Sequence, residues 1–142
     1  MSRHTILIVE DDPGAAESFV PMLGACGYEV RVAVDGKAGV AELAKCDPAA
    51  LIVDLHLPDV DGVTFVRRLR ESVNHRHLPV AIVTGDYLLE DRVAVELTAL
   101  GAGLYFKPLW EDDLVDIVRR LIGSGAENFD DSGKIRTSLA PI

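Results

Sequence analysis

The sequence is poor in cysteine and in basic residues, and it has no long hydrophobic run. Two cysteines are too few for the disulfide framework of a small secreted domain. No apolar stretch reaches the ~18 residues of a membrane span. The first four residues, Met-Ser-Arg-His, lead directly into an apolar run without the small-residue cleavage site of a signal peptide. The sequence therefore predicts a soluble protein of a reducing compartment, and we expect it in the cytoplasm.

The charge balance is strongly acidic. Lys and Arg number 14 and Asp and Glu number 23, which gives a formal net charge of -9. An acidic chain repels nucleic acid and anionic membranes, so neither is expected to be a direct partner. In other respects the composition is ordinary, with 49% hydrophobic and 26% charged residues in 142, and it indicates one globular domain.

Five apolar segments alternate with five segments of helical periodicity. The clearest strand candidates are short, apolar and rich in β-branched residues; they cover residues 5–9, 49–53 and 80–83, with weaker candidates at 29–34 and 104–106. Apolar stripes at helical spacing predict helices that start at residues 13, 36, 62, 90 and 111. The alternation predicts βαβ units, a parallel sheet and an α/β fold. We expect residues 1–122 to form this domain and residues 123–142, which are polar, to form a tail or linker stub.

Polar residues follow the predicted strands where each strand ends. Glu10 and Asp11 follow the first strand, Asp54 the third, Thr84 the fourth and Lys107 the fifth. The carboxyl ends of parallel strands share one edge of a sheet, where ligands bind. Carboxylates gathered there repel one another by ~4 kcal/mol per pair at about 4 Å. Two outcomes relieve this repulsion: one carboxylate stays protonated, or a cation such as Mg²⁺ binds.

The same residues suit phosphoryl chemistry. A carboxylate can attack phosphorus and form an aspartyl phosphate. A metal ion and Lys107 would neutralise the charge on the phosphoryl oxygens, and the Thr84 hydroxyl can donate a hydrogen bond to one of them. Asp54 is therefore a candidate phosphoryl acceptor.

Four segments in order resemble the response-regulator receiver domain of two-component signalling. They are Glu10-Asp11-Asp12-Pro13, the run from Asp54 to Gly62, Val83-Thr84-Gly85, and Lys107-Pro108. The resemblance covers about residues 4–122. It implies a flavodoxin-like (βα)5 three-layer sandwich with five parallel strands in the order 2-1-3-4-5. It also implies a signalling module and not an enzyme, apart from self-phosphorylation and slow autodephosphorylation.

The resemblance also assigns roles. It implies Asp54 as phosphoacceptor, Thr84 as switch hydroxyl and Lys107 as phosphoryl contact. It implies an Mg²⁺ site made by Asp11, Asp54, the backbone carbonyl of His56 and, through a water, Glu10. The implied partners are a histidine kinase or histidine phosphotransfer protein and an unidentified downstream protein. The Lys107-Pro108 bond is similar to one that the family usually keeps cis.

The chain departs from the family pattern in two places. The family usually has an aromatic switch residue three positions before the lysine, where this chain has Leu104, with Tyr105 one position later. A one-residue change of register would send Tyr105 to the opposite face of the sheet. Pro21 lies inside the first predicted helix and is expected to kink or shorten it.

Other interpretations of the sequence are possible. The chain could be a receiver-like scaffold that is not phosphorylated; the complete acidic set argues against this alternative, and the altered fifth strand keeps it open. A phosphatase of the haloacid-dehalogenase type would need an acid where His56 stands, and a flavodoxin-type cofactor binder would not place carboxylates at its phosphate loop. Among the remaining polar residues and cysteines, we expect Asp59 and Asp86 to be surface charges and both cysteines to be at least half-buried.

Overall fold

The computed structural model describes residues 4–123. Five parallel strands form one sheet in the order β2-β1-β3-β4-β5, which confirms the predicted α/β, flavodoxin-like class and strand order. The strands are β1 (Thr5–Val9), β2 (Glu29–Ala33), β3 (Ala50–Asp54), β4 (Val80–Thr84) and β5 (Ala102–Phe106). The helices are α1 (Pro13–Ala25), α2 (Gly36–Lys45), α3 (Gly62–Glu71), the short 3-10 helix η1 (Val73–His75), α4 (Asp91–Ala99) and α5 (Glu111–Ile122).

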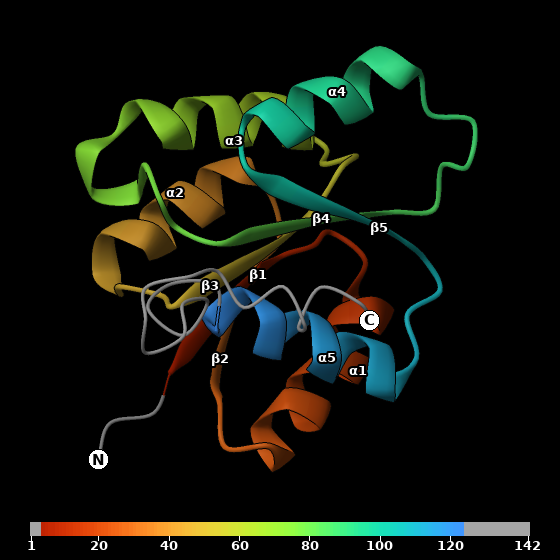
Figure 1. Ribbon diagram of the computed structural model, residues 1–142. Coiled ribbons are helices and arrows are strands. Elements are labelled where there is room, and N and C mark those ends of the chain that lie inside the picture. The colour runs from red at the N-terminus through yellow and green to blue at the C-terminus, as the bar shows by residue number, and fades with distance from the viewer. Residues whose placement is uncertain (1–3, 124–142) are drawn as a thin grey trace, which may run out of the picture.

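The helices cover both faces of the sheet, as Figure 1 shows, with α2, α3 and α4 on one face and α1 and α5 on the other. Side chains of β1 alternate between the two hydrophobic cores. Leu7 and Val9 enter the core under α2–α4, and Ile6 and Ile8 enter the core under α1 and α5. Because both faces are buried, the central strands read as continuous apolar runs in the sequence.

Aspartates begin three of the helices. Asp12 accepts a hydrogen bond from Gly14 N at 2.9 Å, and Asp35 and Asp61 cap α2 and α3 in the same way. The sequence predicts that Pro21 kinks or shortens α1; the helix continues past it to Ala25, so the proline does not end the helix. Phe19 and Leu23, on either side of the proline, are both buried. Their packing offsets the ~3 kcal/mol that an interior proline costs.

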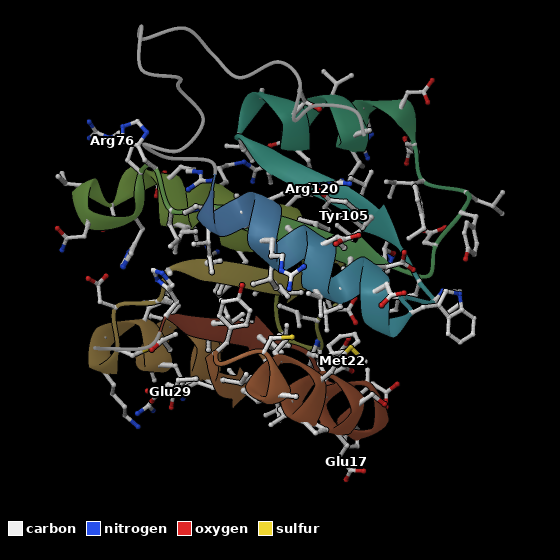
Figure 2. The ribbon with its side chains drawn as sticks, turned by 60° about the horizontal axis from the view of Figure 1, so that its bottom comes forward. Glu17, Met22, Glu29, Arg76, Tyr105 and Arg120 are labelled. Carbon is white, nitrogen blue, oxygen red and sulfur yellow. The ribbon has the colours of Figure 1, made fainter. Side chains whose placement is uncertain are left out.

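Strand β5 is longer than predicted and its side chains divide between the two cores. It begins at Ala102, two residues earlier than expected, and pairs Leu104 with Ile82 and Tyr105 with Val83. Leu104 packs on the core under α2–α4, and Tyr105 packs on the core under α1 and α5. Figure 2 shows Tyr105 on the side of the sheet that carries α5. Tyr105 therefore does not occupy the position of the family's switch aromatic.

Two other expectations need correction. Cys26 is exposed, because it follows the last turn of α1, whereas Cys46 is half-buried. The apolar stripe that predicts the helix from residue 36 includes Val40 and Leu43; Leu43 is buried, but Val40 is 60% exposed. Within the described part of the chain, no helix has the length and apolar character that a membrane span requires.

Candidate functional site

Three acidic residues meet at the carboxyl edge of the sheet. Glu10, Asp11 and Asp54 each offer a carboxylate oxygen, and these oxygens lie within 4.8 Å of one another. The pairing of Val9 with Val53 places Glu10, which follows β1, beside Asp54, the last residue of β3. Glu10 is 1% exposed and Asp54 is 7% exposed, whereas Asp11 is open to solvent. The predicted acidic pocket is therefore formed.

Lys107 connects two of these acids. Its Nζ donates to Glu10 Oε1 at 2.7 Å and to Asp54 Oδ2 at 3.1 Å. The backbone amide of Lys107 donates to Thr84 O at 2.7 Å, and the Lys107-Pro108 bond is cis, as the resemblance implied. Because Lys107 follows β5 while Glu10 follows β1, one ammonium group links opposite parts of the sheet edge.

The loop after β3 orients Asp54. The His56 amide donates to Asp54 Oδ1 at 2.9 Å, and the Gly62 amide donates to Leu55 O at 2.7 Å, which closes the loop behind the acid. A Cβ at Gly62 would lie 2.9 Å from Asp54 O, so only glycine allows this approach. Both oxygens of Asp54 therefore have a fixed donor.

The pocket shifts the pKa values of its members in opposite directions. Burial raises the pKa of Glu10 to about 7, and its hydrogen bond with Asp54 adds to the shift. Burial also opposes ionisation of Asp54, but hydrogen bonds with Glu10, the His56 amide and Lys107 outweigh it and hold its pKa below the usual value. Burial likewise opposes the charge of Lys107, and its two carboxylate partners raise its pKa nonetheless. The pocket thus holds Asp54 as an anion and Glu10 near its titration point at neutral pH.

Thr84 stands at the end of the neighbouring strand. It is completely buried, and its Oγ1 accepts a hydrogen bond from the Asp86 amide at 3.0 Å. Asp86 Oδ2 in turn lies 3.4 Å from His56 Nε2. The strand pairing places Thr84 one position beyond Val83, the partner of Asp54. The loops after β3 and β4 therefore meet beside the acidic pocket.

The sequence reasoning missed an aromatic pair beside Lys107. The Tyr87 hydroxyl donates to the carbonyl oxygen of Lys107, and its ring stacks on Phe106 with centroids 5.4 Å apart. Phe106 pairs with Thr84 across β4 and β5. Both rings lie outside the four motif segments, and no spacing rule links a loop tyrosine to the end of a later strand.

It also missed the role of Asp59. This residue is exposed, as expected for a surface charge, but its oxygens accept hydrogen bonds from Gly36 N at 2.8 Å and Lys37 N at 2.9 Å. These two donors hold the pKa of Asp59 below its usual value. The β3–α3 loop is thereby attached to the first turn of α2.

The chemistry of the pocket fits a hard divalent cation. Three carboxylates supply the oxygen ligands that Mg²⁺ prefers, and Mg²⁺ binds few protein ligands and keeps several waters. The three oxygens come from two buried groups and one open to solvent, so a hydrated ion could enter from the side of Asp11. The acidic cluster resembles the active sites of receiver domains.

Comparison with known proteins identifies the same family. The sequence model of the response regulator receiver domain matches residues 6–119. The DNA-binding dual master transcriptional regulator RpaA of Synechocystis is 34% identical over 118 residues, which are 82% of this chain and 48% of that protein. The transcriptional regulatory protein TrcR of Mycobacterium tuberculosis is 34% identical over 82% of this chain and 44% of its own length. The chain thus spans about half the length of these curated relatives.

Single receiver domains match over nearly their whole length. The chemotaxis protein CheY4 of Vibrio cholerae has a TM-score of 0.77 and 25% identity, covering 84% of this chain and 99% of that one. The receiver domain of the sensor histidine kinase PA1611 of Pseudomonas aeruginosa has a TM-score of 0.75 and 31% identity, covering 86% and 99%. That receiver structure has a magnesium ion coordinated in its active site cleft.

Proposed function

The chain belongs to the response regulator receiver family, and we propose that it accepts a phosphoryl group on Asp54 from a histidine kinase or histidine phosphotransfer protein. Membership of this family implies a cognate kinase partner and a signalling module in place of a true enzyme. The observation that carries the proposal is the state of Asp54. Its carboxylate is buried, yet the His56 amide and Lys107 keep it ionised and oriented.

The transfer would proceed by in-line displacement. An oxygen of Asp54 attacks the phosphorus of a phosphohistidine, the new P–O bond forms, and the P–N bond breaks with its electron pair left on the imidazole nitrogen. Lys107, which contacts Asp54 Oδ2, lies where its charge offsets the negative charge of the incoming group. The low pKa of Asp54 keeps the attacking oxygen unprotonated at neutral pH.

The acidic pocket would also hold Mg²⁺. Asp11, Asp54 and the backbone carbonyl of His56 would be its ligands, with Glu10 acting through a bound water. When bound, Mg²⁺ supplies positive charge against the phosphoryl oxygens. Glu10, whose pKa is about 7, would lose its proton as the cation is taken up.

Phosphorylation would be signalled through the face formed by α4, β5 and α5. The phosphoryl group adds about -1.5 to -2 charges beside Thr84, whose hydroxyl would turn from the Asp86 amide to donate to a phosphoryl oxygen. Because Tyr105 packs on the other core, Thr84 would act on the stacked pair Tyr87 and Phe106. The readout would be contact with a downstream protein, in the cytoplasm and without direct contact to nucleic acid.

The domain proposal assigns residues 1–122 to the receiver. The described helices and strands end at Ile122, at the close of α5. Residues 124–142, most of the segment that we interpret as a tail or linker stub, lie outside the described residues.

The decisive experiment compares the wild-type chain with Asp54→Asn. Each protein is incubated with Mg²⁺ and acetyl phosphate, and its intact mass is then measured by mass spectrometry. We expect one phosphoryl group on the wild type, removable by hydroxylamine, and none on the variant. Asp47→Asn is the matched control, because Asp47 is an exposed acid beyond the end of α2 with no role in the pocket; it should be modified like the wild type.

A receiver-like scaffold that is not phosphorylated is the second candidate. The placement of Tyr105 favours it, since the chain lacks an aromatic residue at the family's switch position. No gain of mass on either folded protein would select the scaffold. Sustained release of phosphate from a small phosphate ester would instead indicate a phosphatase.

A further inference from the structure

A long apolar groove separates α2 from α3, away from the acidic pocket. It has a volume of about 590 Å³, and its apolar lining includes Val40, Leu43, Phe65 and Leu69. A second hollow of about 540 Å³ shares Leu43 and continues the groove toward the end of α2. Figure 1 shows the two helices side by side on the same face of the sheet. The concavity therefore follows most of the length of α2.

Two positively charged side chains line the groove, although the chain as a whole is acidic. Lys37 on α2 and Arg68 on α3 line it and are exposed, and neither has an ion-pair partner among the described residues. Asp59 also lines the groove, but its two oxygens accept hydrogen bonds from backbone amides of α2. The groove thus presents the unpaired cations Lys37 and Arg68 on two facing helices, and its carboxylates are Asp59, which is bound by backbone amides, and Asp47 in the second hollow.

We propose that this groove docks an acidic amphipathic helix of a partner protein. Such a helix would place its apolar stripe between α2 and α3 and its carboxylates against Lys37 and Arg68. The outward residues Val40, Ala41 and Ala44 are exposed and small, so a helix axis can come close to α2. The proposal does not rest on phosphorylation of Asp54.

The shape of the groove favours a helix over a small molecule. Small-molecule pockets enclose roughly 70–90% of their ligand. Here Val40, one of the apolar residues that line the groove, remains 60% exposed, so a small ligand would stay largely in water. A helix of ten residues is about 15 Å long, which matches the length of α2.

The test is an NMR titration of the ¹⁵N-labelled full chain. The probe is a capped synthetic helical peptide with leucines at helical spacing flanked by glutamates, and the control peptide has lysine in place of every glutamate. We expect the glutamate peptide to shift amides of α2 and α3, and the dissociation constant to rise with salt. The double substitution Lys37→Glu with Arg68→Glu should weaken this binding about tenfold and reverse the preference between the two peptides.

A pair of single variants tests the apolar part of the site. Val40→Asp should abolish the shifts in α2 and α3. Val95→Asp should leave them unchanged, because Val95 is 67% exposed on α4, outside the groove. Far-UV circular dichroism verifies that each variant is folded.

Four results would overturn the proposal. The first is no shift in α2 or α3, and the second is equal binding of both peptides. The third is movement of groove amides, without peptide, when Phe129 is replaced by Ser, which would identify the chain's own C-terminal segment as the occupant. The fourth is movement of the same amides with protein concentration alone, which would identify a second copy.

Discussion

At the scale of single residues, Glu10 is an acid in surroundings that disfavour its charge. It is 1% exposed and lies beside Asp54, and within residues 4–123 Lys107 is the only cationic side chain that pairs with its carboxylate. Burial and the neighbouring acid raise its pKa to about 7. A pKa above that of the unfolded chain means that ionised Glu10 destabilises the fold. The acid is therefore kept at a cost in stability, as at many functional sites.

The pH dependence follows from the direction of this shift. The folded chain holds the Glu10 proton up to about pH 7, and the unfolded chain loses it near the ordinary value of 4.5. Below pH 4.5 Glu10 is protonated in both the folded and the unfolded chain, and its stabilising contribution is complete. As the pH rises from 4.5 to about 7, the unfolded chain loses the proton first, so this contribution to the free energy of unfolding is lost. We expect the free energy of unfolding, without divalent cations, to fall by on the order of 1–3 kcal/mol across this interval because of Glu10.

The substitution Glu10→Gln isolates the effect of Glu10 ionisation on the free energy of unfolding. The amide keeps the shape of the side chain and carries no charge, so at pH 8 in EDTA the variant should be more stable than the wild type by about 1 kcal/mol or more. Urea unfolding followed by circular dichroism at pH 5 and pH 8 measures this, and the difference should shrink at pH 5. A variant less stable than the wild type at pH 8 would mean that the Lys107 ion pair outweighs burial.

At the scale of elements, the strands bring the site residues to one edge of the sheet, and the loops that follow determine how these side chains are oriented. The sequence places Glu10, Asp11 and Asp54 at one sheet edge because buried parallel strands have a recognisable pattern and end at acids. The same reasoning cannot find Asp59 or Tyr87, because their partners are backbone groups of α2 and of Lys107, far away in the sequence. Local helix propensity also misleads at Pro21, because α1 continues past the proline to Ala25, and Phe19 and Leu23 on either side of it are buried.

Strand β5 illustrates the same limit. Ala102 and Gly103 carry little strand propensity, so the sequence predicts a start at Leu104. In the structure both residues pair with β4, and the pairing decides which core receives Tyr105. Register is a property of two strands together, so one strand's sequence leaves it open.

Asp59 gives a quantitative test at this scale. Asp59→Ala removes the two acceptors for Gly36 N and Lys37 N and leaves the first turn of α2 without them. We expect a lower free energy of unfolding, as for the loss of a helix cap. Amide hydrogen exchange of Gly36 and Lys37 should become faster, while that of α4 stays unchanged.

Asp47→Ala is the control for this substitution. Asp47 is exposed beyond the end of α2, and its side chain forms no hydrogen bond or ion pair within residues 4–123. Its replacement should change the free energy of unfolding by no more than about 0.5 kcal/mol. Equal losses in both variants would show that removal of a negative charge, and not loss of the cap, is responsible.

At the scale of the whole molecule, two hydrophobic cores hold a charged edge in place. Each face of the sheet is covered by its own helices, so the strand ends that carry the acids cannot move apart without opening a core (Figures 1 and 2). The chain has a net charge of -9, and three of its acids are concentrated in the pocket. Folding thus preorganises a site whose repulsion a cation would relieve.

Because three acids are concentrated in the pocket, we expect Mg²⁺ to stabilise the fold by binding at this site. At about ten times its dissociation constant, a ligand of the native state adds about 1.4 kcal/mol, which raises the melting temperature by about 5 °C for a domain of this size. Any salt also screens a net charge of -9, so the reference is NaCl at the same ionic strength. Asp11→Asn removes the solvent-exposed carboxylate of the cluster and should lose most of the Mg²⁺-specific increment while keeping the response to NaCl. An increment equal in the two proteins, or matched by NaCl, would show that Mg²⁺ acts on the general field of the molecule and that the three carboxylates do not form a cation site.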